Sequence, residues 1–198
     1  MGFRAVSVRI EGASPLLMQS ATLVNPRHEM TKAMKAITKK KTGKTETDLE
    51  ELMRIEWFAN IYTNAAGRVV LPDDNIEGCI IEGAKKSKSG KDCKAGVYSD
   101  SPDNCGFVLE YEGPKDVEKL YEDNRFVDLR AVRVNAARVM RCRPIFRKWA
   151  CDFRVQFNED VLSLGDLQDW VNSAGSLCGV GTFRPKFGRF TVAKFEAE

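Results

Sequence analysis

The stretch SAGSLCGVGTFRPKFGRFTVAKF, residues 173–195, places a glycine-rich basic loop between the end of a helix and the last strand of the chain. Glycine lets the backbone take positive φ or approach another group closely, and cationic side chains beside such a backbone suit phosphate groups. A helix C-cap, with Gly175 at the C′ position, followed by a hairpin with solvated cations explains the same pattern. The loop contains Gly175, Gly179, Gly181, Gly188, Arg184, Lys186 and Arg189.

The segments around this loop predict a mixture of helices and strands. Ser163 is placed to cap a helix whose apolar residues recur at helical spacing before the loop begins. Residues 149–157 and residues 3–11 alternate apolar and polar residues, which is typical of half-buried strands. Further amphipathic helices are expected near residues 47–66 and 73–84, on the same spacing argument.

This order of elements predicts an α+β fold, a ferredoxin-like or RRM-like antiparallel sheet with helices on one face and inserted basic and acidic loops. Such a plan leaves one sheet face or edge free for a single strand of nucleic acid. We expect residues 1–198 to form a single domain, with an insertion at about residues 85–128. The net charge of +3 is too small to decide the class of partner, so the distribution of charge matters more.

Positive charge is concentrated in four segments. Residues 32–44 hold six lysines and no acidic residue, and residues 85–94 hold five lysines and one acid. Residues 138–154 are expected to be a ribbon of two strands joined by a basic turn. Runs of one sign favour contact with a polyanion, although a charge run is also compatible with a solvated face. With the terminal loop, the predicted nucleic-acid contacts are Lys39, Lys40, Lys41, Lys85, Lys86, Lys88, Arg141, Arg143, Arg147, Arg184, Lys186 and Arg189.

Residues 99–128 have the opposite character, with nine acids against three bases. This block is rich in turn residues, and it is expected to be an insertion or a surface layer. A complementary patch for the basic face of a neighbouring copy is the alternative interpretation.

No cofactor, metal site or membrane association is expected. No apolar run reaches about 18 residues, and no signal-peptide core is evident at the start of the sequence. The six cysteines lack the spacing of a zinc site, and His28 is the one histidine. Reduced cysteines in a cytoplasmic protein are therefore expected.

Three sequence pieces resemble the RAMP superfamily, which contains backbone and processing subunits of CRISPR ribonucleoprotein complexes. They are a Gly-x-x-Pro-Leu turn after the first strand (Gly12 to Leu16), a helix introduced by Leu71 to Gly78, and the loop Gly179 to Gly188. In place of the family's proline-glycine-serine-leading motif and lysine-glycine pair, this chain has Asp73 to Asn75 and Glu77-Gly78. The chain is short for a backbone subunit, which fits a compact or phage-borne relative.

The resemblance implies an RRM-derived core, basic loops that bind single-stranded RNA, and head-to-tail assembly. Homo-oligomers or a larger protein complex are therefore the expected protein partners. Phe183 and Phe187 could stack on bases, or could pack beneath the final strand. Processing members resemble metal-independent endoribonucleases that use a histidine near the first helix, a position that His28 occupies here.

Three functions remain open at this point. The favoured one is a non-catalytic subunit that binds single-stranded nucleic acid, RNA by preference, in a ribonucleoprotein-like assembly. The second is a ribonuclease that uses His28, and the third is a structural or inhibitory protein-interaction subunit that does not bind nucleic acid.

Overall fold

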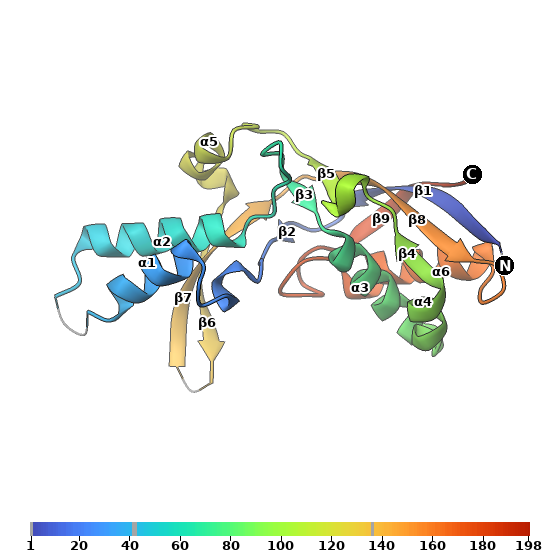
Figure 1. Ribbon diagram of the computed structural model, residues 1–198, viewed down its shortest axis with the longest axis horizontal. Helices are drawn as coiled ribbons and strands as arrows, with labels where there is room; N and C mark the ends of the chain where they lie inside the picture. Colours follow the sequence, from blue (N-terminus) through green and yellow to red (C-terminus); the bar gives the residue numbers. More distant parts are fainter. Residues whose placement is uncertain (1, 41–42, 136) are drawn as a thin grey trace.

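A β-α-β-β-α-β unit forms one side of the molecule, in the computed structural model that describes residues 2–40, 43–135 and 137–198 (Figure 1). The main sheet has the strand order β3-β5-β8-β1-β9, and β4 also pairs with β8. The α+β, ferredoxin-like prediction is confirmed. The six elements of this unit are β1 (Phe3–Gly12), α3 (Asp73–Ala84), β4 (Val97–Ser99), β8 (Ala150–Asn158), α6 (Leu164–Ser173) and β9 (Phe190–Ala197), and β5 (Phe107–Glu110) is a further strand that pairs with β8.

The alternation in β1 and β8 explains why only one face of the sheet is buried. The two strands are antiparallel, with Val8 opposite Phe153 and Ser7 opposite Arg154. Valine and phenylalanine therefore share the face that α3, α4 (Gly90–Gly96) and α6 cover, while serine and arginine share the opposite face (Figure 1). We call the uncovered side the open sheet face.

A smaller sheet extends the molecule on one side of this unit (Figure 1). Its strand order is β2-β7-β6, and α2 packs on β7. Both chain termini lie at the opposite end of the molecule. The remaining elements are β2 (Leu16–Leu17), η1 (Thr22–Val24), α1 (Glu29–Thr38), α2 (Glu46–Asn60), β3 (Val70–Leu71), η2 (Lys85–Ser87), η3 (Pro102–Asn104), α5 (Val117–Glu122), η4 (Asn124–Phe126), β6 (Val127–Val134), β7 (Ala137–Phe146) and the π-helical turn η5 (Ala174–Cys178).

Two expectations about the middle of the chain differ from the structure. The basic ribbon was expected across residues 138–154, but β7 pairs with β6, and β8 belongs to the other sheet. Periodicity identified the strands but could not choose their partners, because pairing depends on tertiary contacts. Within residues 85–128, β4 and β5 both pair with β8. The boundaries of an insertion stay a prediction.

Within the part of the chain that the structure describes, the helices are too short or too polar to cross a membrane.

Candidate nucleic-acid interface

The backbone of the terminal loop is held against the segment that follows β1. The amide of Gly188 donates to the carbonyl of Pro15 at 2.8 Å, and the amide of Thr182 donates to that of Leu17 at 3.0 Å. Near the other end, the Arg189 amide donates to Ser14 Oγ at 2.9 Å. These bonds fix a loop that is otherwise irregular, so its exposed side chains project from a defined backbone.

Three of the four glycines have positive φ, and each is needed for contact with the protein's own backbone. A Cβ atom on Gly179, Gly181 or Gly188 would lie 2.7, 2.6 or 1.8 Å from the carbonyl oxygen of Phe187, Leu17 or Val180. These glycines therefore allow close contact between two parts of the protein's own backbone, and not with a ligand. Gly175 directly follows Ala174, the C-cap of α6, and so occupies the predicted C′ position, but it lies in the π-helical turn. The helical winding continues through Cys178, and Gly179, with φ 77°, ends it.

The exposed side of this loop borders a cavity of about 550 Å³. Lys86 reaches it from η2, beyond the end of α3, and Phe183 and Arg184 reach it from the loop. Glu82 is its one acidic lining residue among those described. The Lys85 ammonium, 2.5 Å from Glu82, lowers the pKa of that carboxyl and offsets its charge. The cavity therefore has cations on two sides.

A second hollow, of about 670 Å³, lies next to the first and is lined by four lysines. They are Lys85, Lys88, Lys91 and Lys94, which η2, α4 and the turn between them bring together. Lys85 and Lys86 are consecutive and link the two hollows. We call the exposed cations of both hollows and the loop the loop-side basic surface: Lys85, Lys86, Lys88, Lys91, Lys94, Arg184 and Lys186. Of these, only Lys85 has an ion pair within the described residues.

Arg130 on β6 supports the aromatic side chains of the loop. Asp128 holds its guanidinium through two hydrogen bonds, of which the one from Nε is 2.5 Å long. The same guanidinium lies 4.5 Å from the ring centroid of Phe187 and 5.7 Å from that of Phe183. Phe187 is buried, whereas Phe183 is exposed. The loop therefore rests on the β6–β7 hairpin.

The three predicted arginines of β7 and its following turn contact the protein itself. Arg141 donates to the buried carboxylate of Glu56 at 2.7 Å, and Arg147 donates to the carbonyl of Arg125. Arg143 is 7% exposed, and burial lowers its pKa. No hydrogen-bond partner for its Nη1 is found among the described residues. Arg141 therefore ties β7 to α2, and none of the three arginines is presented freely to a ligand.

The predicted contacts after α1 lie away from the terminal loop. Lys39 is exposed at the C-cap of α1, and Lys40 forms an ion pair of 2.7 Å with Asp48. Lys41 lies outside the described residues. The structure therefore brings together the predicted residues of the η2 segment and of the terminal loop, and places those after α1 elsewhere.

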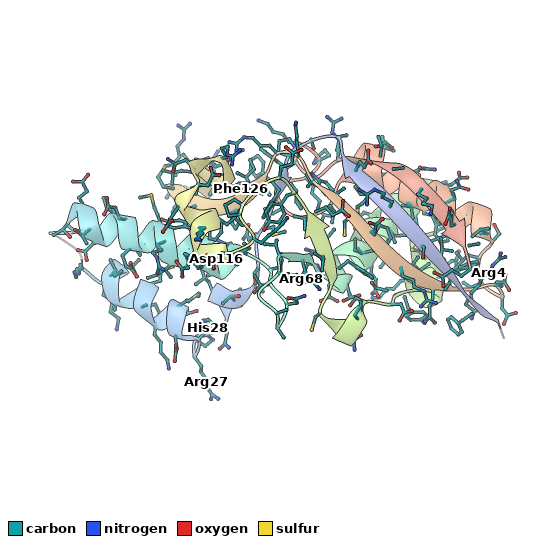
Figure 2. The ribbon with its side chains drawn as sticks, turned by 90° about the horizontal axis from the view of Figure 1, so that it is seen from above. Arg4, Arg27, His28, Arg68, Asp116 and Phe126 are labelled. Carbon is teal, nitrogen blue, oxygen red and sulfur yellow. The ribbon has the colours of Figure 1, made fainter. Side chains whose placement is uncertain are left out.

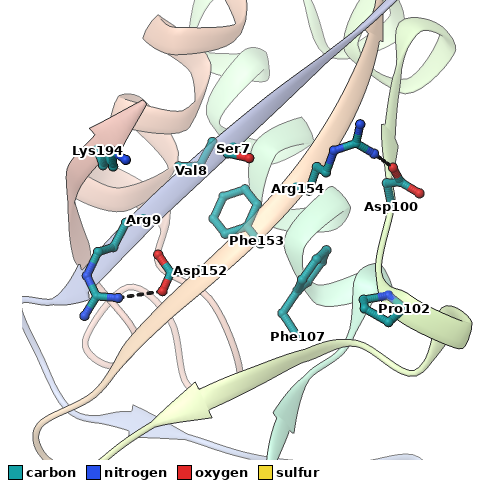
Figure 3. A pocket seen from close by; sticks show the side chains of 10 residues that line it. All are labelled: Ser7, Val8, Arg9, Asp100, Pro102, Phe107, Asp152, Phe153, Arg154 and Lys194. Carbon is teal, nitrogen blue, oxygen red and sulfur yellow. Dashed lines mark hydrogen bonds and ion pairs between the residues drawn. The ribbon is translucent and has the colours of Figure 1, made fainter. Parts of the chain in front are cut away.

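The open sheet face has a hollow of about 360 Å³, but its cations are paired (Figure 3). Arg9 contacts Asp152 at 2.6 Å and Glu110 at 2.7 Å. Arg154 contacts Asp100 and, at 2.9 Å, Glu198. Arg9 also pairs with Glu11, and Lys194 pairs with Glu196. The carboxylates that pair with these three cations are Glu11, Glu110, Asp152, Asp100, Glu198 and Glu196. Three cations among six carboxylates do not suit a polyanion.

His28 is used as the N-cap of α1, at the outer side of the molecule (Figure 2). Its Nδ1 accepts the amide N–H of Met30 at 3.3 Å. A ring that accepts through Nδ1 while neutral carries its proton on Nε2, so neither nitrogen offers a free lone pair in this arrangement. His28 borders a cavity of about 340 Å³ with Tyr62 and Cys105, apart from the loop-side basic surface.

An apolar groove of about 420 Å³ lies between α1, α2 and the β6–β7 hairpin. Leu49, Leu129 and Met140 line it, and each is about half exposed. Lys44 and Arg141 also line it. The sequence pattern did not predict this groove, because its walls come from segments about 80 residues apart.

Lys91, Lys94 and Arg130 are further residues of this region that were not among the predicted contacts. A signal for the two lysines was present in the sequence. Residues 91 and 94 are three apart, so a helix over this segment places both side chains on one side. No local signal connected Arg130 with the loop, because 53 residues separate it from Phe183.

The comparisons with known proteins support the fold alone. No family model matches this sequence. A search of curated proteins finds no match either. One similar solved chain belongs to the cryo-EM structure of the Type III-B Cmr-beta bound to cognate target RNA, with a TM-score of 0.53 and 11% identity. The match covers 98% of this chain and 60% of that one, so this chain spans less than two thirds of its length.

Proposed function

We propose that this protein binds single-stranded RNA through the loop-side basic surface, as a non-catalytic subunit of a ribonucleoprotein complex. The observation that carries the proposal is the contrast in pairing. The cations around the two hollows are exposed and, apart from Lys85, without ion pairs among the described residues, whereas the arginines of the open sheet face are bonded to carboxylates. Unpaired cations can exchange small counterions for phosphates, which provides favourable binding free energy.

The shared fold supports the same proposal. The similar chain comes from a complex bound to target RNA, and the sequence resembles the RAMP superfamily at its terminal loop. We therefore propose single-stranded RNA as the ligand of this chain, and a multi-subunit complex as the assembly to which it belongs. A homo-oligomer and a cytoplasmic location stay predictions.

The test is a titration of a labelled single-stranded RNA of about 12 nucleotides, followed by fluorescence anisotropy across a potassium chloride series. Binding should weaken steeply with salt. The variant Lys86→Ala/Arg184→Ala/Lys186→Ala should bind at least about tenfold more weakly and show a smaller salt slope. The control variant Arg4→Ala/Arg27→Ala/Lys194→Ala also removes three positive charges, and it should retain the affinity and the salt slope of the wild type. Absence of binding at low salt, or equal losses in the two variants, would contradict the proposal.

The apolar groove favours a second candidate function, a protein-interaction subunit that does not bind nucleic acid. Its three half-exposed side chains, Leu49, Leu129 and Met140, are the kind that a protein contact would cover. This candidate predicts that Met140→Glu disrupts complex formation in cells, and that the protein purified from those cells carries no RNA. RNA that copurifies with the wild-type protein and is lost from the lysine and arginine variant would exclude it.

A further inference from the structure

The geometry of the terminal loop points to a base-stacking site: we infer that Phe183 stacks on an unpaired nucleobase whose flanking phosphates contact Lys86 and Arg184. This inference rests on the proposed function and adds to it the part of the ligand that is recognised. It predicts that the affinity for a strand depends on accessible bases as well as on the charge of the phosphate backbone.

The backbone of Phe183 is unusual for its residue type. Its φ is 59°, in the left-handed region that bulky side chains rarely adopt. The surrounding loop keeps it there: the amide of Thr182 is bonded to Leu17, and the amide of Phe187 donates to the carbonyl of Phe183 at 3.3 Å. A strained backbone that holds a large side chain in solvent is a feature that functional sites retain.

The ring of Phe183 is exposed in a way that the ring of Phe187 is not. Phe183 is 46% exposed, and Phe187 is 7% exposed in a small apolar cluster with Leu17 and Ile145. The two rings meet edge to face, at 5.9 Å and 64°. Phe187 therefore supports the loop from below, and Phe183 is available to a ligand.

The position of the ring is reinforced by Arg130. Its guanidinium lies over Phe183 and Phe187 and is itself fixed by Asp128. A ring held in this manner loses little conformational freedom when it stacks on a base, which favours binding.

The cavity beside Phe183 provides the groups that the rest of a nucleotide needs. Lys86 and Arg184 line the same cavity. Its volume of about 550 Å³ is in the range of small-ligand sites. Stacking on an aromatic ring, with cations along the backbone path, is the usual way in which proteins hold single strands without reading their sequence.

The test compares two probes of equal charge: a labelled single-stranded oligoadenylate of about 12 nucleotides, and the same strand with abasic sites in place of its bases. The wild-type protein should bind the strand with bases about tenfold more tightly. Phe183→Leu should remove most of that preference and leave the salt slope unchanged, because leucine has no aromatic face. Phe183→Tyr should retain the preference.

Phe3→Leu serves as the matched control, since Phe3 is an exposed aromatic residue at the far end of β1. It should retain the preference of the wild type, and thermal unfolding should confirm that each variant is folded. Equal binding of both probes by the wild type, or a preference that persists in Phe183→Leu, would overturn the inference and leave the proposed function standing. Absence of binding to either probe would overturn both.

Discussion

The open sheet face and the loop-side basic surface are both rich in cations, but they differ in what those cations contact. On the sheet face, Arg9 and Arg154 each bond to at least two carboxylates, so the positive charge is already neutralised. On the loop side, Lys86, Lys88 and Arg184 face hollows and have no ion pair among the described residues. A count of basic residues does not distinguish these two regions. The partners of each cation do.

The largest effect is expected from breaking the loop itself. In Gly188→Ala the new Cβ would lie 1.8 Å from the Val180 carbonyl oxygen, at a φ of 75°. We expect the free energy of unfolding to fall by about 3–5 kcal/mol, measured by chemical denaturation. Gly67→Ala is the control, because its φ is 72° but nothing lies within 4 Å of the new Cβ. It should cost about 1 kcal/mol. Equal losses would mean that close packing does not hold the loop.

The next effect sharpens the contrast between the two cationic regions. The variant Lys88→Gln/Lys91→Gln/Lys94→Gln removes three exposed charges that make no ion pair among the described residues. For a single strand, each lost phosphate contact lowers the salt slope by about 0.7, so the slope should fall by about 2. The measurement is the salt series described above. Lys194→Gln, on the sheet face, should leave the slope unchanged, and a change of similar size there would remove the distinction.

The third effect uses the cysteines as reporters of position. Burial raises the pKa of Cys79, Cys93, Cys142 and Cys151 to about 12, so these thiols should stay protonated and inert at about pH 8. Cys178 lines the cavity beside Phe183, and Cys105 is exposed near His28. Bound RNA should slow the alkylation of Cys178, measured by mass spectrometry, and leave that of Cys105 unchanged. Protection of Cys105 instead would place the ligand near His28.

The smallest effect concerns acid and the sheet face. The hydrogen bond from Arg9 lowers the pKa of Glu110 below its ordinary value of 4.5. Stability from this pair is therefore fully present above about pH 4.5, and it is lost as the pH falls through the lower folded pKa. Because Glu110 is half exposed, the contribution should be under about 1 kcal/mol. Arg9→Gln should reduce the loss of thermal stability between about pH 5 and pH 3. An unchanged acid profile would show that the pair contributes nothing.

Much of the core could be predicted from the sequence, because local patterns determined it. The alternation of Val6, Val8 and Ile10 and the apolar series from Cys151 to Phe157 identified two central strands and their buried face. The capping role of Ser163 was also correct, since its side chain accepts the amide of Asp166. Strand pairing could not be predicted in the same way. β7 lies beside β6 because of contacts that no short stretch contains.

The candidate site was only partly predictable for a related reason. The terminal loop and the lysines after α3 were identified as separate basic segments, and their proximity depends on the packing of α3 against α6 and the π-helical turn. The same lack of tertiary information made Arg141 and Arg143 resemble surface cations, although the fold buries one and pairs the other with Glu56. Charge in a sequence does not indicate whether a carboxylate will lie beside it.

The central claim is that single-stranded RNA lies on the loop-side basic surface, and photocrosslinking tests it most directly. An RNA with a photoreactive base at every position would be bound to the protein, irradiated and digested, and its crosslinked peptides identified by mass spectrometry. Crosslinks should fall within residues 179–189, with Phe183 prominent, and within residues 85–94. Crosslinks confined to β1, β8 and β9 would place the RNA on the open sheet face and contradict the claim.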